Sequence, residues 1–537
     1  MASSIKRNAP GLYRMAKWAY DAPSHLVLET SGGSTLLKSA QGVRQGDPLG
    51  PLFFSIGVRP ILEDLCNSLG PDCVLLAYLD DVYILSKSEG TLEHVSNFFD
   101  RPNNSLKLNE EKSYTTSVME IKMRGLKILG SHIGPSWSRQ EFLLGKVAKL
   151  EEKLQRLVDL PNQHALLLLR LCMQQDLRHL QRCLDPDGLS DEWERVDQAI
   201  WKAAIRIRGS TDQPDPSDLD ERLLSLPVRL GGLGLLSHQT CAPLAFAASS
   251  ETSDQLLIPM LGAPAFEPML TDADDPESIK SQKDRCDEAL LAQRDALLAT
   301  LDDHEMKTIL ESASGLGRKW LEVIPYYGSL RLSDFEVSGA LHLRTLHPGS
   351  EVICPQCGNR NCVGHAETCT GRARWVVARH EQVKRAIAAS LSKIEGVQVS
   401  VEPFIAQTNR RNDIRVTGSS ASGLANHEYD VTIVSLATRD GRDAFIPAHQ
   451  LPTNIAEKGH ALIDKFLSKK AADKVNRLPA NSIPFSPLVF TVGGMMDAKT
   501  ADVIKTWKDS MSIPAHKDLT YQLSLILLRA RAKTFVL

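Results

Sequence analysis

The stretch AYLDDVYIL, residues 77–85, carries two adjacent aspartates, Asp80 and Asp81, between two short apolar runs. The runs at 74–78 and 82–85 are rich in β-branched and aromatic residues, which predicts two strands joined by a tight turn. Adjacent carboxylates at the tip of an apolar hairpin are unfavourable unless positive charge lies against them. Two divalent cations would supply that charge, as they do in two-metal phosphoryl transfer. An ordinary Asp-Asp turn is the alternative.

A second unusual stretch, GVRQGDPLGPLFF at residues 42–54, precedes the hairpin. Gly46 would let the backbone approach a ligand closely, while Pro48 and Pro51 would stiffen the exit into an apolar helix. A glycine-rich loop that only caps a helix is the alternative. The occurrence of both stretches at this spacing disfavours that alternative.

The two stretches together resemble motifs B and C of reverse transcriptases, and QGDPLGPLFF is similar to the form found in non-LTR retrotransposons. The resemblance implies a polymerase palm that takes an RNA template and deoxynucleotides and uses Mg²⁺ or Mn²⁺. It makes Asp80 and Asp81 catalytic metal ligands. Residues 106–112 look like motif D, and residues 125–130 look like motif E. The implied template- and nucleotide-binding residues are Gln45, Gly46, Asp47, Pro48, Tyr78 and Lys112.

The palm of this family also has a catalytic aspartate in motif A, on a strand before motif B. Asp21 and Glu29 are the only acids ahead of Asp47, and Asp21 lies in WAYDAPS, residues 18–24. That segment resembles the connection between motifs A and B. Loss of a metal-binding carboxylate should abolish most polymerisation. We therefore expect an N-terminally truncated reverse transcriptase that does not polymerise by itself.

Four of the ten cysteines fall between residues 354 and 369. Cys354, Cys357, His365 and Cys369 give the spacing C-x2-C-x7-H-x3-C, and thiolates with an imidazole suit tetrahedral Zn²⁺. Cys362 either replaces His365 or is a bystander. The spacing resembles the CCHC zinc knuckle between polymerase and endonuclease in site-specific non-LTR elements. By that resemblance the knuckle would present basic side chains to nucleic acid, namely Arg360, Arg372 and Arg374.

Two acids in consecutive predicted strands follow the cysteine cluster. Asp413 opens one strand and Asp430 lies in the next, so antiparallel pairing would bring their carboxylates together to hold a divalent ion. The order of knuckle, R-x-D at 411–413 and DVTIV at 430–434 resembles the restriction-like endonuclease of the same elements. That enzyme is a PD-(D/E)xK nuclease, and the resemblance implies target DNA as its substrate.

The nuclease segment departs from the usual pattern at two positions. Asn412 stands where Pro is usual, and Thr432 stands where Lys is usual. In the group that the segment resembles, a lysine from the following helix takes that place. The candidates are Lys458, Lys470 and Lys474, of which Lys470 fits best as the catalytic lysine.

The chain of 537 residues is long enough for several domains. Residues 227–235 contain three glycines, which we interpret as a packed turn rather than a phosphate loop because no strand precedes them. We expect a multidomain α+β protein. Its parts would be a partial right-hand palm (1–135), a helical thumb (136–235), a helical connector (236–345), a zinc knuckle (346–375), an α/β nuclease domain of PD-(D/E)xK type (376–515) and a C-terminal helix (516–537).

The overall composition excludes some classes of protein. A net charge of −3 argues against a chain that is basic throughout, although local basic patches remain open. No apolar run approaches the roughly 20 residues that span a bilayer, and no signal-peptide core opens the chain. We expect no membrane association and, from the family, a nuclear location.

Two functions follow from these patterns. The first is a retrotransposon enzyme that nicks target DNA and extends the nick by target-primed reverse transcription. The second is a degenerate, catalytically inactive remnant that binds nucleic acid. The missing motif A favours the second for polymerisation, whereas Asp413 and Asp430 favour the first for nicking.

Overall fold

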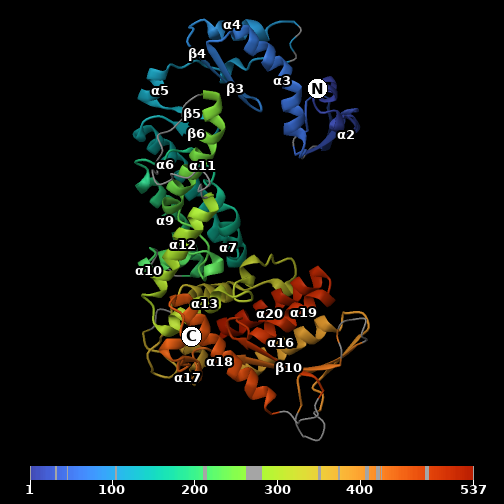
Figure 1. The fold of residues 1–537 in the computed structure, drawn as a ribbon, viewed down its shortest axis with the longest axis vertical. Helices are drawn as coiled ribbons and strands as arrows, with labels where there is room; N and C mark the ends of the chain where they lie inside the picture. Colours follow the sequence, from blue (N-terminus) through green and yellow to red (C-terminus); the bar gives the residue numbers. More distant parts are fainter. Residues whose placement is uncertain are drawn as a thin grey trace. The chain divides into compact units, whose positions relative to one another are not determined.

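The computed structural model describes residues 2–30, 33–40, 42–44, 46–102, 104, 106–209, 215–261, 281–348, 352–372, 375–404, 411–418, 424, 426–477 and 483–535. The chain divides into two compact units, Met1–Gly130 and Ser131–Leu537 (Figure 1). This division lies close to the boundary that the sequence predicts between palm and thumb. Within the described ranges, no helix combines the length and the apolar character that crossing a membrane requires.

Unit 1 is built from one long helix, several short helices and two antiparallel hairpins. β1 (Ser24–Thr30) pairs with β2 (Gly33–Ser39), and β3 (Cys73–Tyr78) pairs with β4 (Asp81–Ser86). The second hairpin confirms the strands predicted on either side of the two aspartates. The other elements of the unit are α1 (Ala2–Asn8), α2 (Pro10–Tyr20), α3 (Gly50–Leu69), α4 (Thr91–Phe99), η1 (Glu110–Lys112), α5 (Val118–Arg124) and β5 (Leu126–Ile128).

The long helix α3 organises unit 1 because both of its halves are covered. Pro51 stands in its first turn, where a missing N–H breaks no helical hydrogen bond. Near that end, Phe53 is buried with apolar residues of α1 and α2. Farther along, Leu65 is buried with Phe98 of α4, and apolar side chains of β3 and β4 pack against them. One helix therefore carries the loop at 42–49 and supports the aspartate hairpin.

Unit 2 begins with a helical region whose inward faces share one core. The buried side chains of this core include Leu143, Trp193 and Ile200, and the region is helical, as predicted for residues 136–235. The elements are β6 (Ser131–Ile133), α6 (Ser136–Gln155), η2 (Arg156–Asp159), α7 (Asn162–Leu171), η3 (Met173–Gln175), α8 (Leu180–Cys183), α9 (Ser190–Arg208), α10 (Asp218–Ser225), η4 (Val228–Leu230), α11 (His238–Leu261), α12 (Gln282–Leu298), α13 (Asp303–Ala313), η6 (Lys319–Glu322), η7 (Gly328–Leu330) and α14 (Asp334–Arg344).

The glycine-rich turn at 227–235 packs against a buried arginine of α14. The Arg344 guanidinium donates to the carbonyls of Gly232 at 2.7 Å and Val228 at 3.2 Å. A phosphate loop presents N–H groups to its ligand, whereas this turn presents carbonyls to a cation. The interpretation as a packed turn is therefore confirmed.

The rest of unit 2 is an α/β region built on a four-stranded mixed sheet. The strand order is β10-β9-β8-β7. β8 (Ile414–Gly418) runs antiparallel to both β7 (Val397–Val401) and β9 (His427–Val434), and β10 (Phe485–Thr491) runs parallel to β9. The antiparallel pairing of β8 with β9 confirms the arrangement expected for the strands of Asp413 and Asp430. The sequence did not predict β10 as a strand of this sheet.

Helices cover both faces of the sheet (Figure 1). On one face, α16 (Val376–Leu391), α19 (Ala498–Ser510) and α20 (Ile513–Thr534) bury a core that includes Val431 and Leu488. On the other face, α13 and α18 (Ile455–Val475) bury a core that includes Val489. Thus α13 and α20 complete the two cores of the sheet, although α13 lies wholly and α20 mostly outside the range 376–515 that the sequence predicts for the nuclease domain. The short elements of this region are α15 (His365–Thr368), α17 (Arg439–Arg442) and η9 (Ala448–Gln450).

Candidate active sites and metal centre

The aspartate hairpin of unit 1 is tight and exposed. Tyr78 pairs with Asp81 in the strand register, so Leu79 and Asp80 alone form the turn. Leu79 has a φ of 55°, in the left-handed region that is unfavourable for a residue with a Cβ. Both aspartates and Tyr78 are exposed, and the described part of the chain brings no third His, Cys, Asp or Glu ligand to them. Two neighbouring carboxylates of this kind could hold Mg²⁺ together with substrate phosphates.

The loop that precedes α3 is anchored to α2 through Asp47. Its carboxylate accepts hydrogen bonds from the Tyr20 hydroxyl and, at 2.9 Å, from the Leu49 N–H. The hydrogen bond from Tyr20 holds the pKa of Asp47 below its usual value. Gly46 has a φ of 89°, a conformation that favours glycine. Asp47 therefore shapes the loop, a role that the sequence did not reveal, and its part in nucleotide binding stays a prediction.

The other predicted pocket residues are less closely defined. Pro48 is exposed just before α3, and Lys112 is exposed at the end of η1. Gln45 lies outside the described residues. Among the residues that are described, no hydrogen bond or ion pair joins this set to Asp80 or Asp81, so a shared nucleotide site stays a prediction.

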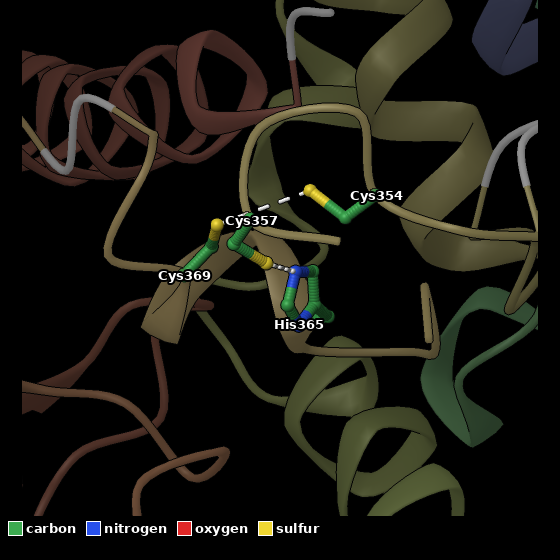
Figure 2. A group of neighbouring side chains, drawn as sticks. All are labelled: Cys354, Cys357, His365 and Cys369. Atoms are coloured by element: carbon green, nitrogen blue, oxygen red, sulfur yellow. Dashed lines mark hydrogen bonds between the residues drawn. The ribbon is translucent and has the colours of Figure 1, made fainter. Parts of the chain in front are cut away.

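The four predicted zinc ligands gather in unit 2 (Figure 2). The ligand atoms of Cys354, Cys357, His365 and Cys369 all lie within 4.8 Å of one another. Cys354 Sγ is 3.9 Å from Cys369 Sγ, and Cys357 Sγ is 3.3 Å from His365 Nε2. Tetrahedral Zn²⁺ with bonds of about 2.3 Å to sulfur would separate two sulfurs by about 3.8 Å, so the set fits zinc. Cys362 is exposed and lies outside the group, as a bystander would.

Two left-handed glycines set the positions of these ligands. Gly358, with a φ of 73°, closes the first turn by donating to the Cys354 carbonyl at 2.8 Å. Gly364, with a φ of 79°, starts the short helix α15. The N–H of Cys369 donates to the His365 carbonyl at 2.8 Å, so these two ligands sit one turn apart.

The position of Arg372 differs from the prediction that this arginine faces nucleic acid. Its side chain is buried, and it donates to Cys354 Sγ at 3.5 Å and to the Thr534 carbonyl at 3.4 Å. It therefore joins the knuckle to α20 instead of facing nucleic acid. Arg360 is exposed, and Arg374 lies outside the described residues.

Glu367 makes a second connection between the knuckle and the α/β region. Its carboxylate accepts hydrogen bonds from Arg531 Nε at 2.5 Å and from the Ser435 hydroxyl. Arg531 also pairs with Glu311 of α13 at 3.0 Å. The segment that carries the four candidate zinc ligands is thus packed into unit 2 through buried charges.

Asp413 is fixed at the edge of the sheet where β8 begins. Its carboxylate accepts hydrogen bonds from the Val431 N–H at 2.6 Å and from His380 Nε2 at 3.1 Å. The same histidine nitrogen lies 3.1 Å from the Val431 carbonyl, which can only accept, so Nε2 carries the proton. Burial opposes charge on Asp413, but these hydrogen bonds keep the pKa of its carboxyl below the usual value. The hydrogen bond to Asp413 in turn raises the pKa of His380.

Asp430 lies in the neighbouring strand and pairs with a lysine of α18. Its Oδ2 is 2.6 Å from Lys474 Nζ. Burial raises the pKa of Asp430, Lys474 opposes this shift, and repulsion from Asp413 adds to it. Ile414 pairs with Tyr429 in the antiparallel register of β8 and β9, so Asp413 and Asp430 are the next two residues to face each other.

The lysine beside Asp430 is Lys474, not the Lys470 that the sequence favoured. Lys470 lies one helical turn earlier and pairs with Asp440 at 2.7 Å. Lys458 stands near the start of α18, about 24 Å along the helix axis from Lys474 at 1.5 Å per residue. A single turn of roughly 5.4 Å decides between Lys470 and Lys474, and that offset depends on how α18 packs against the sheet.

Both departures from the usual nuclease pattern have a structural counterpart. Asn412, in place of Pro, donates to the buried Glu428 carboxylate at 2.6 Å. Thr432, in place of Lys, shares a strand face with Asp430, and its buried hydroxyl has no hydrogen-bond partner among the described residues. A buried polar atom without a partner points to an unseen water or ion. The two carboxylates and this hydroxyl are oxygen donors of the kind that a hydrated divalent cation takes, whereas the Lys474 ammonium pairs with Asp430 and cannot be a ligand.

Sequence reasoning missed a buried lysine behind Asp413. Lys384 is 2% exposed in its side chain and pairs with Glu381 at 2.6 Å and with Glu402 at 2.7 Å. Its charge also lowers the pKa of Asp413. The available signal was spacing, because Lys384 follows His380 by four residues and the two lie on one helix face.

Two comparisons with known proteins bear on these sites. Residues 11–133 match the family described as reverse transcriptase (RNA-dependent DNA polymerase). The matched range contains Asp80, Asp81 and the loop at 42–49, which confirms the predicted reverse transcriptase domain. The chain is also 22% identical, over 491 residues and 87% of its length, to the retrotransposable element SLACS 132 kDa protein of Trypanosoma brucei gambiense. It spans 37% of the length of that relative.

Proposed function

We propose that this chain joins a reverse transcriptase domain to a metal-dependent DNA endonuclease within a non-LTR retrotransposon protein. The family match and the retrotransposon relative support the first half of this proposal. One observation carries the second half. Asp413 and Asp430 face each other at the end of the paired strands β8 and β9, next to the pair of Ile414 and Tyr429, and Lys474 is paired with Asp430 at 2.6 Å.

Each residue of the nuclease site has a distinct task. The Val431 N–H and His380 favour the ionised form of Asp413, and Lys474 opposes the rise that burial causes in the pKa of Asp430. A bound Mg²⁺ would supply an activated water and neutralise charge on the phosphodiester. Lys474 is partly exposed, so its ammonium can leave Asp430 and donate to a phosphate oxygen. Thr432 offers a hydroxyl to a metal-bound water.

The reverse transcriptase domain would use the exposed aspartate hairpin. Asp80 and Asp81 would hold Mg²⁺ or Mn²⁺, with the RNA template, the primer end and deoxynucleotides approaching beside Tyr78. In this proposal the endonuclease nicks target DNA in the nucleus, and the nick primes copying of the RNA. The chain is expected not to polymerise by itself, so the test is primer extension on an RNA template. Metal-dependent synthesis that is lost in Asp80→Asn would contradict that expectation.

The knuckle would bind Zn²⁺ through Cys354, Cys357, His365 and Cys369. The closed set of four ligands is typical of a structural site, and the buried links of Arg372 and Glu367 support a structural role. In this proposal zinc stabilises the segment that Arg372 and Glu367 connect to the α/β region.

A plasmid-nicking assay with Mg²⁺ tests the endonuclease. The native chain should convert supercoiled DNA to open circles, and Asp413→Ala and Asp430→Ala should each slow this by more than about a hundredfold. The matched control is Asp473→Ala, because Asp473 is exposed on the same helix next to Lys474. It should nick at the native rate. Absent nicking, or nicking that survives both alanine changes, would leave the inactive remnant as the function.

A further inference from the structure

A cavity of about 280 Å³ lies in the α/β region of unit 2. It is walled by α16, the end of β9, α18, α20 and the knuckle helix α15. Two consecutive residues of α16 connect it to the site already described. His380 contacts Asp413, whereas Arg379 lines the cavity.

The guanidinium of Arg379 is buried in the cavity wall. Arg379 is only 7% exposed, and its Nε has no hydrogen-bond partner within the described part of the chain. Burial lowers the pKa of Arg379 from its usual value. A buried charge without a hydrogen-bonded counterion is costly, and proteins rarely retain one without a use for it.

The two carboxylates in the cavity wall are each held by another cation. Glu367 accepts a hydrogen bond from Arg531 Nε at 2.5 Å, and Asp440 pairs with Lys470 at 2.7 Å. Neither of these two carboxylates is therefore paired with Arg379, whose guanidinium could pair with a ligand.

The surroundings of Arg379 suit an anion that arrives from outside. The cavity reaches the surface, because Val376 and the Asp440 side chain in its wall are 49% and 61% exposed. Arg379 also stands in the first turn of a helix of 16 residues, where N–H groups and the helix dipole favour negative charge. The volume is ample for a phosphate group with several waters.

We propose that Arg379 binds a phosphate group of the nucleic acid strand that the nuclease cuts, at a position beside the scissile bond. The guanidinium fork suits phosphate oxygens, which it can engage through two parallel hydrogen bonds. The assignment of the phosphate to nucleic acid rests on the proposed endonuclease function. Such a contact would fix the register of the strand without reading its sequence.

A competing explanation is purely structural. Arg531 lies between Glu311 and Glu367, so this buried trio carries net negative charge that Arg379 could balance at a distance. The two explanations predict opposite effects of Arg379 on the stability of the ligand-free protein. An arginine that balances the charge of this trio stabilises the protein without ligand. An arginine that binds a ligand is buried without a counterion until the ligand arrives, and it therefore destabilises the protein without ligand.

The test compares the full chain with Arg379→Met and with the control Arg385→Met. Arg385 lies on the same helix and is 78% exposed in its side chain. One measurement is thermal unfolding in inorganic phosphate and in sodium chloride of equal ionic strength. The other is fluorescence anisotropy of a duplex DNA with unphosphorylated ends, without divalent cations. Neither measurement requires cleavage, so failure of the nuclease proposal would be seen separately in the nicking assay.

We expect Arg379→Met to unfold at the native temperature or higher and to lose the stabilisation by inorganic phosphate. Its dissociation constant for duplex DNA should rise by about tenfold or more, and the salt dependence of binding should fall by about one phosphate contact. Arg385→Met should match the native chain in all four quantities. A lower unfolding temperature with phosphate stabilisation retained would overturn the proposal. Loss of phosphate stabilisation with unchanged duplex binding would overturn the assignment to nucleic acid.

Discussion

The two pairs of aspartates in this chain contrast in almost every physical respect. Asp80 and Asp81 are consecutive, exposed and placed by a two-residue turn. Asp413 and Asp430 come from different strands and are largely buried, and each interacts with a cationic or protonated side chain. The position of the first pair is determined by residues that are adjacent in the sequence. The position of the second pair is determined by the packing of a sheet against two helices. The sequence motif that is easier to recognise, that of Asp80 and Asp81, thus belongs to the pair that is more exposed.

The largest expected difference between the two aspartate pairs is their response to the removal of zinc. Removal of the metal by a chelator should destabilise unit 2 by several kcal/mol, because Arg372 and Glu367 tie the knuckle to α20. Hydrogen exchange measured on peptides should rise around Asp413 and stay unchanged around Asp80. Nicking should fall at least about tenfold and return when Zn²⁺ is restored.

Two variants control this measurement. Cys357→Ser should reproduce the effect of the chelator, and Cys362→Ser should not, because Cys362 lies outside the ligand group. If the chelator raised exchange equally in both units, the proposed dependence of the nuclease pair on tertiary support would be wrong.

A smaller difference is expected when one aspartate of each pair is removed. Asp413→Ala leaves the buried Val431 N–H without its acceptor and leaves His380 with the Val431 carbonyl alone, which should cost about 1–3 kcal/mol of the stability of unit 2. Asp80→Ala should leave unit 1 almost unchanged, since its side chain is exposed. Denaturant unfolding followed by hydrogen exchange reports both units. Equal losses would show that the hairpin carboxylate has a buried partner.

These contrasts explain what the sequence could and could not predict. The hairpin of Asp80, the zinc spacing and the strands of Asp413 and Asp430 depend on residues close together in the chain, and all were predicted. The choice of Lys474 over Lys470 depends on one turn of α18 against the sheet.

Burial was the other property that the sequence could not give. Arg372 and Arg379 look like ordinary surface arginines in a charged stretch, yet both are buried. Arg372 is used by Cys354 and by the end of α20, which is far away in the sequence. The role of β10 was missed for the same reason, because its parallel partner β9 lies a whole helix earlier.

The smallest expected difference concerns backbone strain next to each pair. Leu79 and Glu402 both have positive φ, at 55° and 56°. Leu79→Gly should stabilise unit 1 by up to about 1 kcal/mol, because glycine tolerates this conformation. Glu402→Gly should instead destabilise unit 2, because the buried Lys384 loses a carboxylate at 2.7 Å. Unfolding midpoints of opposite sign would support the contrast, and two gains of stability would contradict it.

The most direct measurement of the central claim is the rate of plasmid nicking with saturating Mg²⁺ for two lysine variants. The claim is that Asp413, Asp430 and Lys474 form one catalytic site. Lys474→Met should lose more than about a hundredfold in rate, while Lys470→Met, one turn away and paired with Asp440, should lose far less. Nicking that depends on Lys470 and survives loss of Lys474 would contradict the account.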